Sequence, residues 1–216
     1  LFKNKSKTKQ QIMKQIQIII LLLFICSCDE DSSYDPTINF ETISNLYAPV
    51  EGGQGQTNSG SFTKFDFETG STTESDTDWD IAFRGTSIIV NGGTGLNDSY
   101  EPERNGDAGA YIFNGTLAQL ESVDNDLFLQ DSQIGYAVQT GSGNGWYNYT
   151  GSPEHLILPI PGKILVFRTR NNKFSKVEIL SYYFDAPESP DGLSDESRYY
   201  TFNYVYQNEA GNTSFY

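Results

Sequence analysis

The amino-acid sequence predicts an all-β protein: a single β-rich domain with long loops and little helix. Apolar and polar residues alternate with a period of two in several segments, which is the pattern of strands with one buried face. The chain contains 14 tyrosines, 14 phenylalanines and 20 glycines, a composition typical of strands joined by turns. Because an aromatic side chain can bury roughly 150–250 Å², we expect these residues to supply most of the core.

Alternation predicts two strands before residue 140, at residues 79–83 (WDIAF) and 134–138 (IGYAV). In each segment every second residue is apolar, so three large side chains share one face of the strand. These side chains are Trp79, Ile81 and Phe83 in the first segment and Ile134, Tyr136 and Val138 in the second. Both patterns are typical of half-buried strands.

Three more strands are predicted towards the C-terminus. Residues 163–169 (KILVFRT) are apolar on both faces, which indicates a central strand. Asn171 and Asn172 separate this strand from residues 174–184 (FSKVEILSYYF), and because asparagine tolerates positive φ, the two strands are expected to form a hairpin. Residues 198–207 (RYYTFNYVYQ) form the last strand, with four aromatic side chains on one face. We interpret these four as core: Tyr200, Phe202, Tyr204 and Tyr206.

Helical spacing is limited to residues 115–123 (GTLAQLESV), where Leu117 and Leu120 predict about one amphipathic turn or two. Residues 92–109 and 185–197 form two long loops, and loops of this length in a compact domain are usually functional lids or flexible segments. The sequence has no internal repeat. We therefore expect one β domain at residues 41–216.

The N-terminal segment predicts an export signal. Residues 16–28 (IQIIILLLFICSC) form an apolar run preceded by lysines, and the run is shorter than the roughly 20 residues of a membrane-spanning helix. Signal peptidases require a small residue before the cleaved bond, and of the two cysteines only Cys28 follows one, Ser27. We therefore expect residues 1–27 to be removed and Cys28 to carry the lipid that anchors the protein.

The residues after the anchor are polar and acidic, and we interpret residues 28–40 as a tether. Asp29, Glu30 and Asp31 resemble the acidic export signal that sends lipoproteins of Bacteroidetes to the outer face of the outer membrane. The expected location is therefore the cell surface, with membrane contact through the lipid alone. Met13 is an alternative start, because the sequence from Met13 onward reads as a complete lipoprotein signal by itself.

Charge and cysteine content exclude some partners and some sources of stability. Removal of residues 1–27 leaves nine basic and 28 acidic residues, a net charge of about −19. This charge excludes nucleic acid as a bulk electrostatic partner, and an acidic surface is ordinarily a solubility device. Cys28 is the one cysteine that would remain, so stability is expected to come from the core and not from a disulfide.

No enzyme signature is present in the sequence. His155 is the one histidine, which excludes a zinc site with two histidines, and no GxSxG motif occurs. The glycine cluster at residues 92–95 lacks the GK[ST] ending of a phosphate loop. The acids at Asp191, Asp195 and Glu196 lack the ligand spacing of a calcium loop. We therefore expect a binding protein and not an enzyme.

Five sequence blocks together resemble one protein family. They are TDWDIAFRGTSIIVNGG, GWYNY, HLILPIPGKILVFRT, KFSKVEILSYYF and YYTFNYVYQ, and they extend from about Phe62 to Gln207. Their order and spacing are similar to those of the HmuY-like heme-binding lipoproteins of Bacteroidetes. The resemblance implies an all-β, HmuY-like domain that binds heme for iron acquisition, as a hemophore does. It also implies that the heme passes to a TonB-dependent receptor in the outer membrane.

The resemblance implies that heme iron is held between two side chains, histidines or methionines, supplied by loops. The mature chain has no methionine and one histidine, so His155 is the candidate metal ligand. In the other interpretation, a lone histidine at a strand entrance is structural or faces solvent. Further options are a tyrosinate such as Tyr136 or Tyr147, or stacking without a protein ligand. With one ligand at most, we expect five-coordinate or high-spin heme.

Heme propionates are anionic, so a heme site on this acidic protein must gather basic residues. Arg84 and Arg104 are the first candidates, with Lys163 as a third, whereas Arg168 and Arg170 lie beside the hairpin turn and are expected to be solvated. The candidate aromatic walls of the site are Trp146, Tyr147 and Tyr149. We expect two of these three to belong to the core.

The leading interpretation is a lipid-anchored heme-binding protein that is not an enzyme. The alternative is a binding module of the same fold whose ligand is not heme, such as another tetrapyrrole or a surface glycan. Aromatic loops on a surface lipoprotein would suit sugar stacking. A glycan hydrolase would need a close pair of carboxylates in a cleft, which no sequence pattern reveals.

Overall fold

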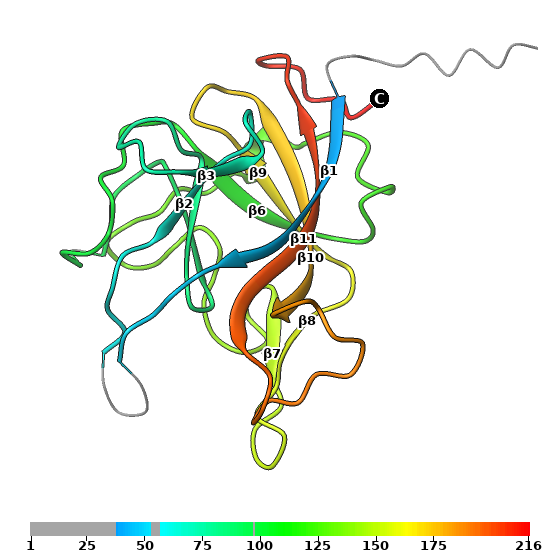
Figure 1. Ribbon diagram of the computed structural model, residues 1–216. Coiled ribbons are helices and arrows are strands. Elements are labelled where there is room, and N and C mark those ends of the chain that lie inside the picture. The colour runs from blue at the N-terminus through cyan, green and yellow to red at the C-terminus, as the bar shows by residue number, and fades with distance from the viewer. Residues whose placement is uncertain (1–37, 53–56, 97) are drawn as a thin grey trace, which may run out of the picture. The chain divides into compact units, whose positions relative to one another are not determined.

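The computed structural model describes residues 38–52, 57–96 and 98–216, which belong to one compact unit, Asp35–Tyr216 (Figure 1). The prediction of an all-β protein is confirmed, because the described residues form strands β1 to β11 and one short 3-10 helix, η1 (Asn125–Leu127). In the described part of the chain, no helix has the length and apolar character needed to cross a membrane.

The larger sheet has five antiparallel strands in the order β1-β11-β10-β9-β6. Figure 1 shows β1 (blue) running beside β11 (orange to red), and their residues pair from Ile38 with Gln207 to Tyr47 with Tyr199. The bounds are β1 Ile38–Tyr47, β6 Gly109–Asn114, β9 Lys163–Arg168, β10 Phe174–Tyr183 and β11 Ser197–Gln207. β1 was not predicted as a strand, and it begins three residues before the expected domain boundary.

The hairpin between β9 and β10 confirms two predictions. β9 lies between β10 and β6 with its inner residues buried on both faces, as expected of a central strand. Phe174 pairs with Arg168 across the hairpin, and Asn172 in the connecting turn has a φ of 57°. Asparagine adopts this left-handed conformation more readily than most residues, so the turn chemistry and the hairpin agree.

The smaller sheet has four antiparallel strands in the order β3-β2-β4-β5. Its bounds are β2 Thr63–Asp66, β3 Ser71–Thr73, β4 Ile81–Arg84 and β5 Ser87–Val90. A separate hairpin is formed by β7 (Tyr147–Tyr149) and β8 (Ile157–Pro159), and it projects at the lower end of the view in Figure 1.

Aromatic side chains fill the space between the two sheets. The four residues predicted on one face of the last strand are all buried in the main core cluster, which confirms that prediction. They contact rings from the smaller sheet: Phe83 lies 4.8 Å from Tyr200 between ring centroids, and Phe65 lies 5.6 Å from Phe202. Tilted and edge-on contacts of this kind add to the stabilisation from burial.

The strand predicted at residues 134–138 is wrong. Ile134 is 97% exposed, and Ser132 and Gly135 close a tight turn through paired backbone hydrogen bonds. The buried carboxylate of Asp131 accepts a hydrogen bond from the backbone nitrogen of Ala137, which ties this segment to a side chain and not to a neighbouring strand. Alternation in a short stretch is therefore insufficient where a local acceptor satisfies the backbone.

Of the one or two amphipathic turns predicted at residues 115–123, the structure forms a single turn at residues 117–119 and no α-helix. The ammonium group of Lys176, on β10, is bonded to this segment. It donates to the backbone carbonyls of Leu117 and Leu120, at 2.6 and 2.7 Å. These two carbonyls are therefore satisfied by a side chain of the larger sheet.

Trp79 lies on the opposite side of the smaller sheet from the position that alternation predicts. β4 begins only at Ile81, and the bend before it turns Trp79 towards Ala82 and Ile89. Ile81 and Phe83 face the main core as expected. Both faces of β4 are therefore buried, a situation in which alternation stops being informative.

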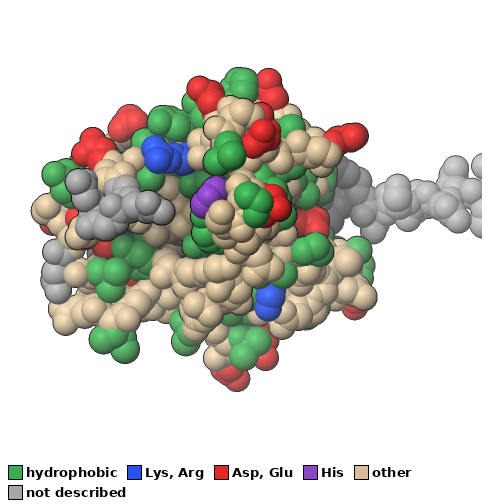
Figure 2. Space-filling model, turned by 90° about the horizontal axis from the view of Figure 1, so that it is seen from below, with side chains coloured by type: hydrophobic (Ala, Val, Ile, Leu, Met, Phe, Trp, Pro, Cys, Tyr) green, Lys and Arg blue, Asp and Glu red, His purple; other side chains and the backbone are tan. Residues whose placement is uncertain are grey.

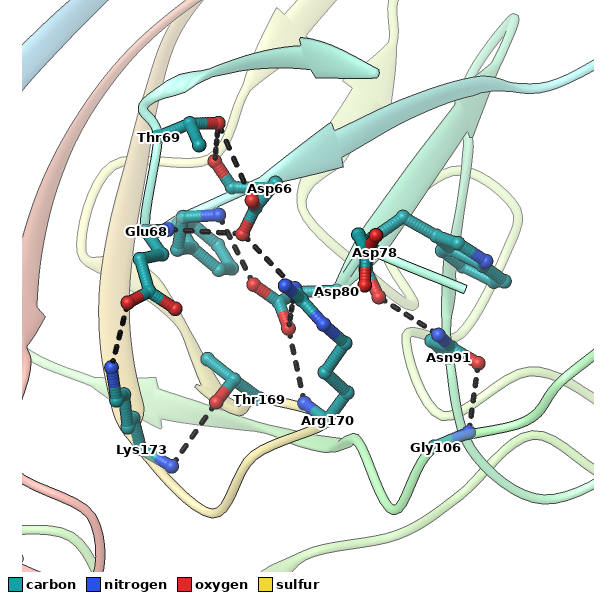
Figure 3. Close-up of polar contacts among 12 residues, drawn as sticks. Asp66, Glu68, Thr69, Asp78, Asp80, Asn91, Gly106, Thr169, Arg170 and Lys173 are labelled. Carbon is teal, nitrogen blue, oxygen red and sulfur yellow. Dashed lines mark hydrogen bonds and ion pairs between the residues drawn. The ribbon is translucent and has the colours of Figure 1, made fainter. Parts of the chain in front are cut away.

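The prediction that Arg170 is solvated is wrong. Figure 3 shows its guanidinium group between two buried carboxylates, with Nη1 at 3.0 Å from Asp66 and 3.1 Å from Asp80. Arg168, by contrast, pairs with the exposed Asp107. Arg170 comes after the end of β9, where the chain turns inward over the acids of the smaller sheet. Arg168 and Arg170 lie two residues apart in sequence, but only Arg170 faces the buried acids of the smaller sheet.

Candidate functional site

The loop between β7 and β8 holds the one histidine of the chain in a defined conformation. The loop is closed by two backbone hydrogen bonds, from Thr150 to Leu156 at 2.9 Å and from His155 to Gly151 at 2.7 Å. His155 has a φ of 54°, a left-handed conformation in which the surrounding loop fixes the backbone. Its imidazole Nδ1 is hydrogen-bonded to the phenol oxygen of Tyr149.

This histidine and tyrosine lie at the surface. Tyr149 is 43% exposed and His155 is partly buried. The loop at residues 185–197 packs against the backbone of His155, because a Cβ atom on Gly192 would come within 2.7 Å of the His155 carbonyl group. Figure 2 shows the histidine (purple) on the face seen from below, with hydrophobic side chains beside it. We call Tyr149 and His155 the hairpin pair.

A second group of predicted site residues meets at the loop of residues 92–104. Arg84 forms an ion pair with Asp98 at 2.7 Å, and the phenol of Tyr136 donates to Glu101 at 2.5 Å. Glu101 also forms an ion pair with Nη1 of Arg104 at 2.8 Å, and Asp131 forms a second ion pair with Nη2 of the same guanidinium group at 3.0 Å. The structure therefore brings Arg84, Tyr136 and Arg104 together through carboxylates that sequence reasoning did not identify.

Two adjoining clefts open beside this second group, and both fall within the size range of small-molecule sites. The larger has a volume of about 570 Å³ and the smaller about 400 Å³. Arg84, Tyr100 and Tyr136 line the larger cleft, and Arg104 lines the smaller one with Glu101 and Glu103. Arg84 and Arg104 already contact carboxylates. An anionic ligand would therefore gain less binding free energy from these arginines than the sequence prediction assumed.

The environment of Tyr136 favours its neutral phenol. Burial raises the pKa of Tyr136 well above its ordinary value, and the hydrogen bond and charge of Glu101 raise it further. Arg84 and Arg104 oppose this shift only in part. A phenol that keeps its proton is a poor iron ligand, so this position is less suited to a tyrosinate than the sequence alone suggested.

Two of the three candidate aromatic walls belong to the core, as expected. Trp146 and Tyr147 are buried, and both contact Thr86 in the turn after β4. The Trp146 indole donates to the Thr86 carbonyl at 3.0 Å, and the Thr86 hydroxyl donates to the Tyr147 phenol at 3.3 Å. Tyr149 alone of the three remains at the surface, where a ligand can reach it.

Sequence reasoning missed the pairing of Tyr149 with His155. The signal that could have found it is the segment TGSPE between them, whose glycine, serine and proline are typical of a reversing turn. Such a turn brings the side chains at its two ends together. Among the residues that the structure describes, no group of three or more His, Cys, Asp or Glu side chains is placed to hold a metal ion. Cys28 lies outside the described residues.

No protein-family model matches the chain. No curated protein matches it either. The structure is similar to that of a candidate lipoprotein from Bacteroides fragilis, with a TM-score of 0.47 and 15% identity over 82% of this chain and 92% of that one.

It is also similar to the apo form of an HmuY analog from Tannerella forsythia, with a TM-score of 0.46 and 11% identity, covering 80% of this chain and 96% of that one. A candidate HmuY-like heme-binding protein from Bacteroides vulgatus has a TM-score of 0.38 and 15% identity, covering 80% and 93%. These three likenesses concern the course of the chain alone.

Proposed function

We propose that this protein binds heme outside the cytoplasm, is held at the outer membrane by lipid on Cys28, and passes heme to a TonB-dependent receptor. The five sequence blocks that resemble HmuY-like lipoproteins support this proposal. The export signal ending at Ser27 and the acidic residues after Cys28 support the location. Binding and transfer, without chemical conversion, require no enzyme chemistry.

The observation that carries the proposal is the hairpin pair. Heme iron in proteins is held by a small set of side chains, among which histidine and tyrosine are common. Tyr149 and His155 place one of each at the surface, in direct contact with each other. Leu193, 76% exposed on the adjoining loop, offers apolar surface to a macrocycle.

The residues present therefore fit heme in two respects, an accessible donor for iron and apolar surface beside it. The face in Figure 2 also carries Lys or Arg side chains, the groups that propionates require. Because the donors number two and touch each other, they cannot take the two opposite sides of one iron. We therefore expect five-coordinate or high-spin ferric heme, bound less tightly than by relatives with two ligands.

Titration of the purified protein with hemin tests the proposal. The expected result is a saturable Soret shift that reaches completion near one hemin per protein. An unrelated acidic lipoprotein domain of similar size serves as the control for nonspecific adsorption. If the protein gives the same spectrum as the control, heme binding is refuted.

Transfer to a receptor has its own test. Heme-loaded protein is mixed with outer-membrane vesicles from the same bacterium, and the loss of the Soret band from the soluble fraction is followed. Transfer is expected to intact vesicles and not to vesicles whose proteins have been digested. Equal loss to both would mean passive partition into lipid and would contradict the receptor.

A glycan is the second candidate ligand, favoured by an exposed aromatic cluster. Tyr47 stacks on Tyr199 with ring centroids 4.8 Å apart, and Phe184 meets Tyr199 edge-on at 5.1 Å. Tyr47 and Phe184 are both exposed, and such faces suit the apolar side of a sugar ring. Binding to immobilised glycans that is lost in Tyr47→Ala, with hemin binding absent, would favour this candidate over heme.

A further inference from the structure

We propose that the two adjoining clefts beside the loop of residues 92–104 bind a neutral saccharide, and that Tyr100 stacks on a sugar ring there. The clefts have volumes of about 570 and 400 Å³, and Asp98 lines both of them. Tyr149 and Tyr47 line neither cleft. The site is therefore separate from the hairpin pair and from the exposed aromatic cluster of Tyr47, and the inference goes beyond heme binding.

The charges that line the clefts favour a ligand without net charge. The lining contains three carboxylates, of Asp98, Glu101 and Glu103, and two arginines, Arg84 and Arg104. An anion would meet this surplus of negative charge, and it would have to displace a carboxylate from an arginine. A cation gains little from Asp98 or Glu101, because an arginine already compensates each of them. A neutral ligand can bind while both ion pairs stay intact.

The ion pair of Arg84 with Asp98 supplies both hydrogen-bonding functions that a sugar hydroxyl requires. A hydroxyl group donates and accepts hydrogen bonds, a carboxylate accepts them, and a guanidinium group donates them. Among the residues that the structure describes, Arg84 donates from Nη1 alone, to Gly60 at 3.1 Å and to Asp98 at 2.7 Å. Its other N–H groups therefore keep donor capacity for a ligand. The guanidinium group lies 4.2 Å from the centroid of the Phe62 ring, which fixes its position.

Tyr100 offers the larger cleft an aromatic face. It lines this cleft and is 50% exposed, and Leu96, which is 39% exposed, adds apolar surface beside it. One face of a pyranose ring carries C–H groups, and an aromatic ring can cover these groups while the hydroxyls reach polar side chains around it. The backbone nitrogen of Tyr100 donates to Asp98 Oδ1 at 3.0 Å. The stacking ring and the acceptor carboxylate are therefore held in one turn.

The loop that carries these side chains is fixed by the buried carboxylate of Glu101. Its side chain is 3% exposed and forms the ion pair with Arg104. It also accepts hydrogen bonds from the backbone nitrogen of Leu96 at 3.2 Å and from the phenol of Tyr136 at 2.5 Å. Asp131, which is fully buried, holds Arg104 in turn. The loop is thus ordered before a ligand arrives, and binding costs little conformational entropy.

Titration of the purified protein with neutral trisaccharides tests the inference, by calorimetry and by NMR of the backbone amides. The probes are maltotriose, cellotriose, mannotriose and triacetylchitotriose, with trigalacturonate as the anionic counterpart. We expect at least one neutral probe to bind saturably and to shift the amide signals of residues 94–96 and 98–101. Trigalacturonate is expected not to bind the wild type, because its carboxylates meet those of the clefts.

Three variants test the assigned contacts. Tyr100→Ala removes the stacking ring and should weaken neutral-probe binding by about 10-fold, the scale of one aromatic contact. The control Tyr216→Ala removes a ring that is 69% exposed at the C-terminus and should leave the affinity unchanged. Asp98→Asn keeps the size of the side chain but removes the charge that compensates Arg84. The guanidinium group then becomes available to an anion, so binding of trigalacturonate should appear in this variant.

The results that would overturn the inference are distinct. If none of the neutral probes binds, the clefts are not a saccharide site. If binding survives Tyr100→Ala but is lost in Tyr47→Ala, the sugar lies on the exposed aromatic cluster instead. Equal binding of trigalacturonate to the wild type and Asp98→Asn would contradict the argument from charge. Circular dichroism checks that each variant is folded, and the amide shifts of the wild type locate the sugar even if a variant is not.

Discussion

Replacing Arg170 by methionine should destabilise the protein far more than the same change at Arg168. Arg170 donates from Nη1 to both Asp66 and Asp80, and its backbone nitrogen donates to Asp80 at 3.0 Å (Figure 3). Asp80 is 1% exposed and Asp66 is also buried. Methionine has a similar length and fills the space, so the variant removes the charge and the hydrogen bonds and leaves little cavity.

The expected loss follows from the two carboxylates that stay behind. Removing one partner of a buried ion pair typically costs about 3–5 kcal/mol, because the remaining charge is buried without compensation. The free energy of unfolding of a natural domain is about 5–15 kcal/mol, so the variant loses a large part of its stability. The pair of Arg168 with Asp107 lies at 3.3 Å at a carboxylate that is 73% exposed. An exposed pair of this kind contributes about 1 kcal/mol at most.

The loss should also depend on pH. Burial raises the pKa of Asp80 from 3.8 to about 6, and Arg170 opposes the rise. Because the pKa of Asp80 is higher in the folded state, the folded state binds this proton more tightly. The contribution of Asp80 to the free energy of unfolding therefore falls as the pH rises from about 4 to above 6. Without Arg170 the pKa of Asp80 rises further. Arg170→Met should therefore lose less stability at about pH 5, where Asp80 is neutral in the folded state, than at about pH 7.

Urea unfolding followed by tryptophan fluorescence measures these differences, since Trp79 and Trp146 are both buried. The wild type, Arg170→Met and the control Arg168→Met are compared at about pH 7 and pH 5. Equal losses in the two variants would refute the reasoning about burial. A loss in Arg170→Met that does not shrink at the lower pH would refute the reasoning about the Asp80 carboxyl.

Three further predictions concern the anchor, the location and the packing of one loop. Cells fed a labelled fatty acid should label the wild type and not Cys28→Ser, and label retained in the variant would contradict lipidation at that cysteine. Protease added to intact cells should remove the domain, whereas complete protection would place it in the periplasm. Gly92→Ala should cost about 1–3 kcal/mol, because a Cβ atom there would lie 1.9 Å from the Ala108 carbonyl oxygen. Gly135→Ala is its control, since nothing lies within 4 Å of that position and unfolding should be unchanged within error.

The hairpin of β9 and β10 and the aromatic face of β11 were predictable because their signals are local. Asparagine in the turn tolerates the positive φ that a tight hairpin requires. The four aromatic residues of β11 alternate along the strand, so they share one face, and that face is buried. The failure at residues 134–138 has the opposite cause. There, the backbone nitrogen of Ala137 donates to the side chain of Asp131, which the alternation pattern does not connect to this segment.

The sequence by itself determined the all-β class, the two long loops and the set of residues from which a site can be built, because these depend on residue types and on spacing along the chain. It could not determine which phenol meets which acid or base. Only the tertiary structure places Glu101 against Tyr136 and Arg104, and so holds the phenol neutral and occupies the arginine. The same structure leaves Tyr149 at the surface beside His155. Reactivity depends on distance and burial, and these follow from the packing of segments far apart in sequence.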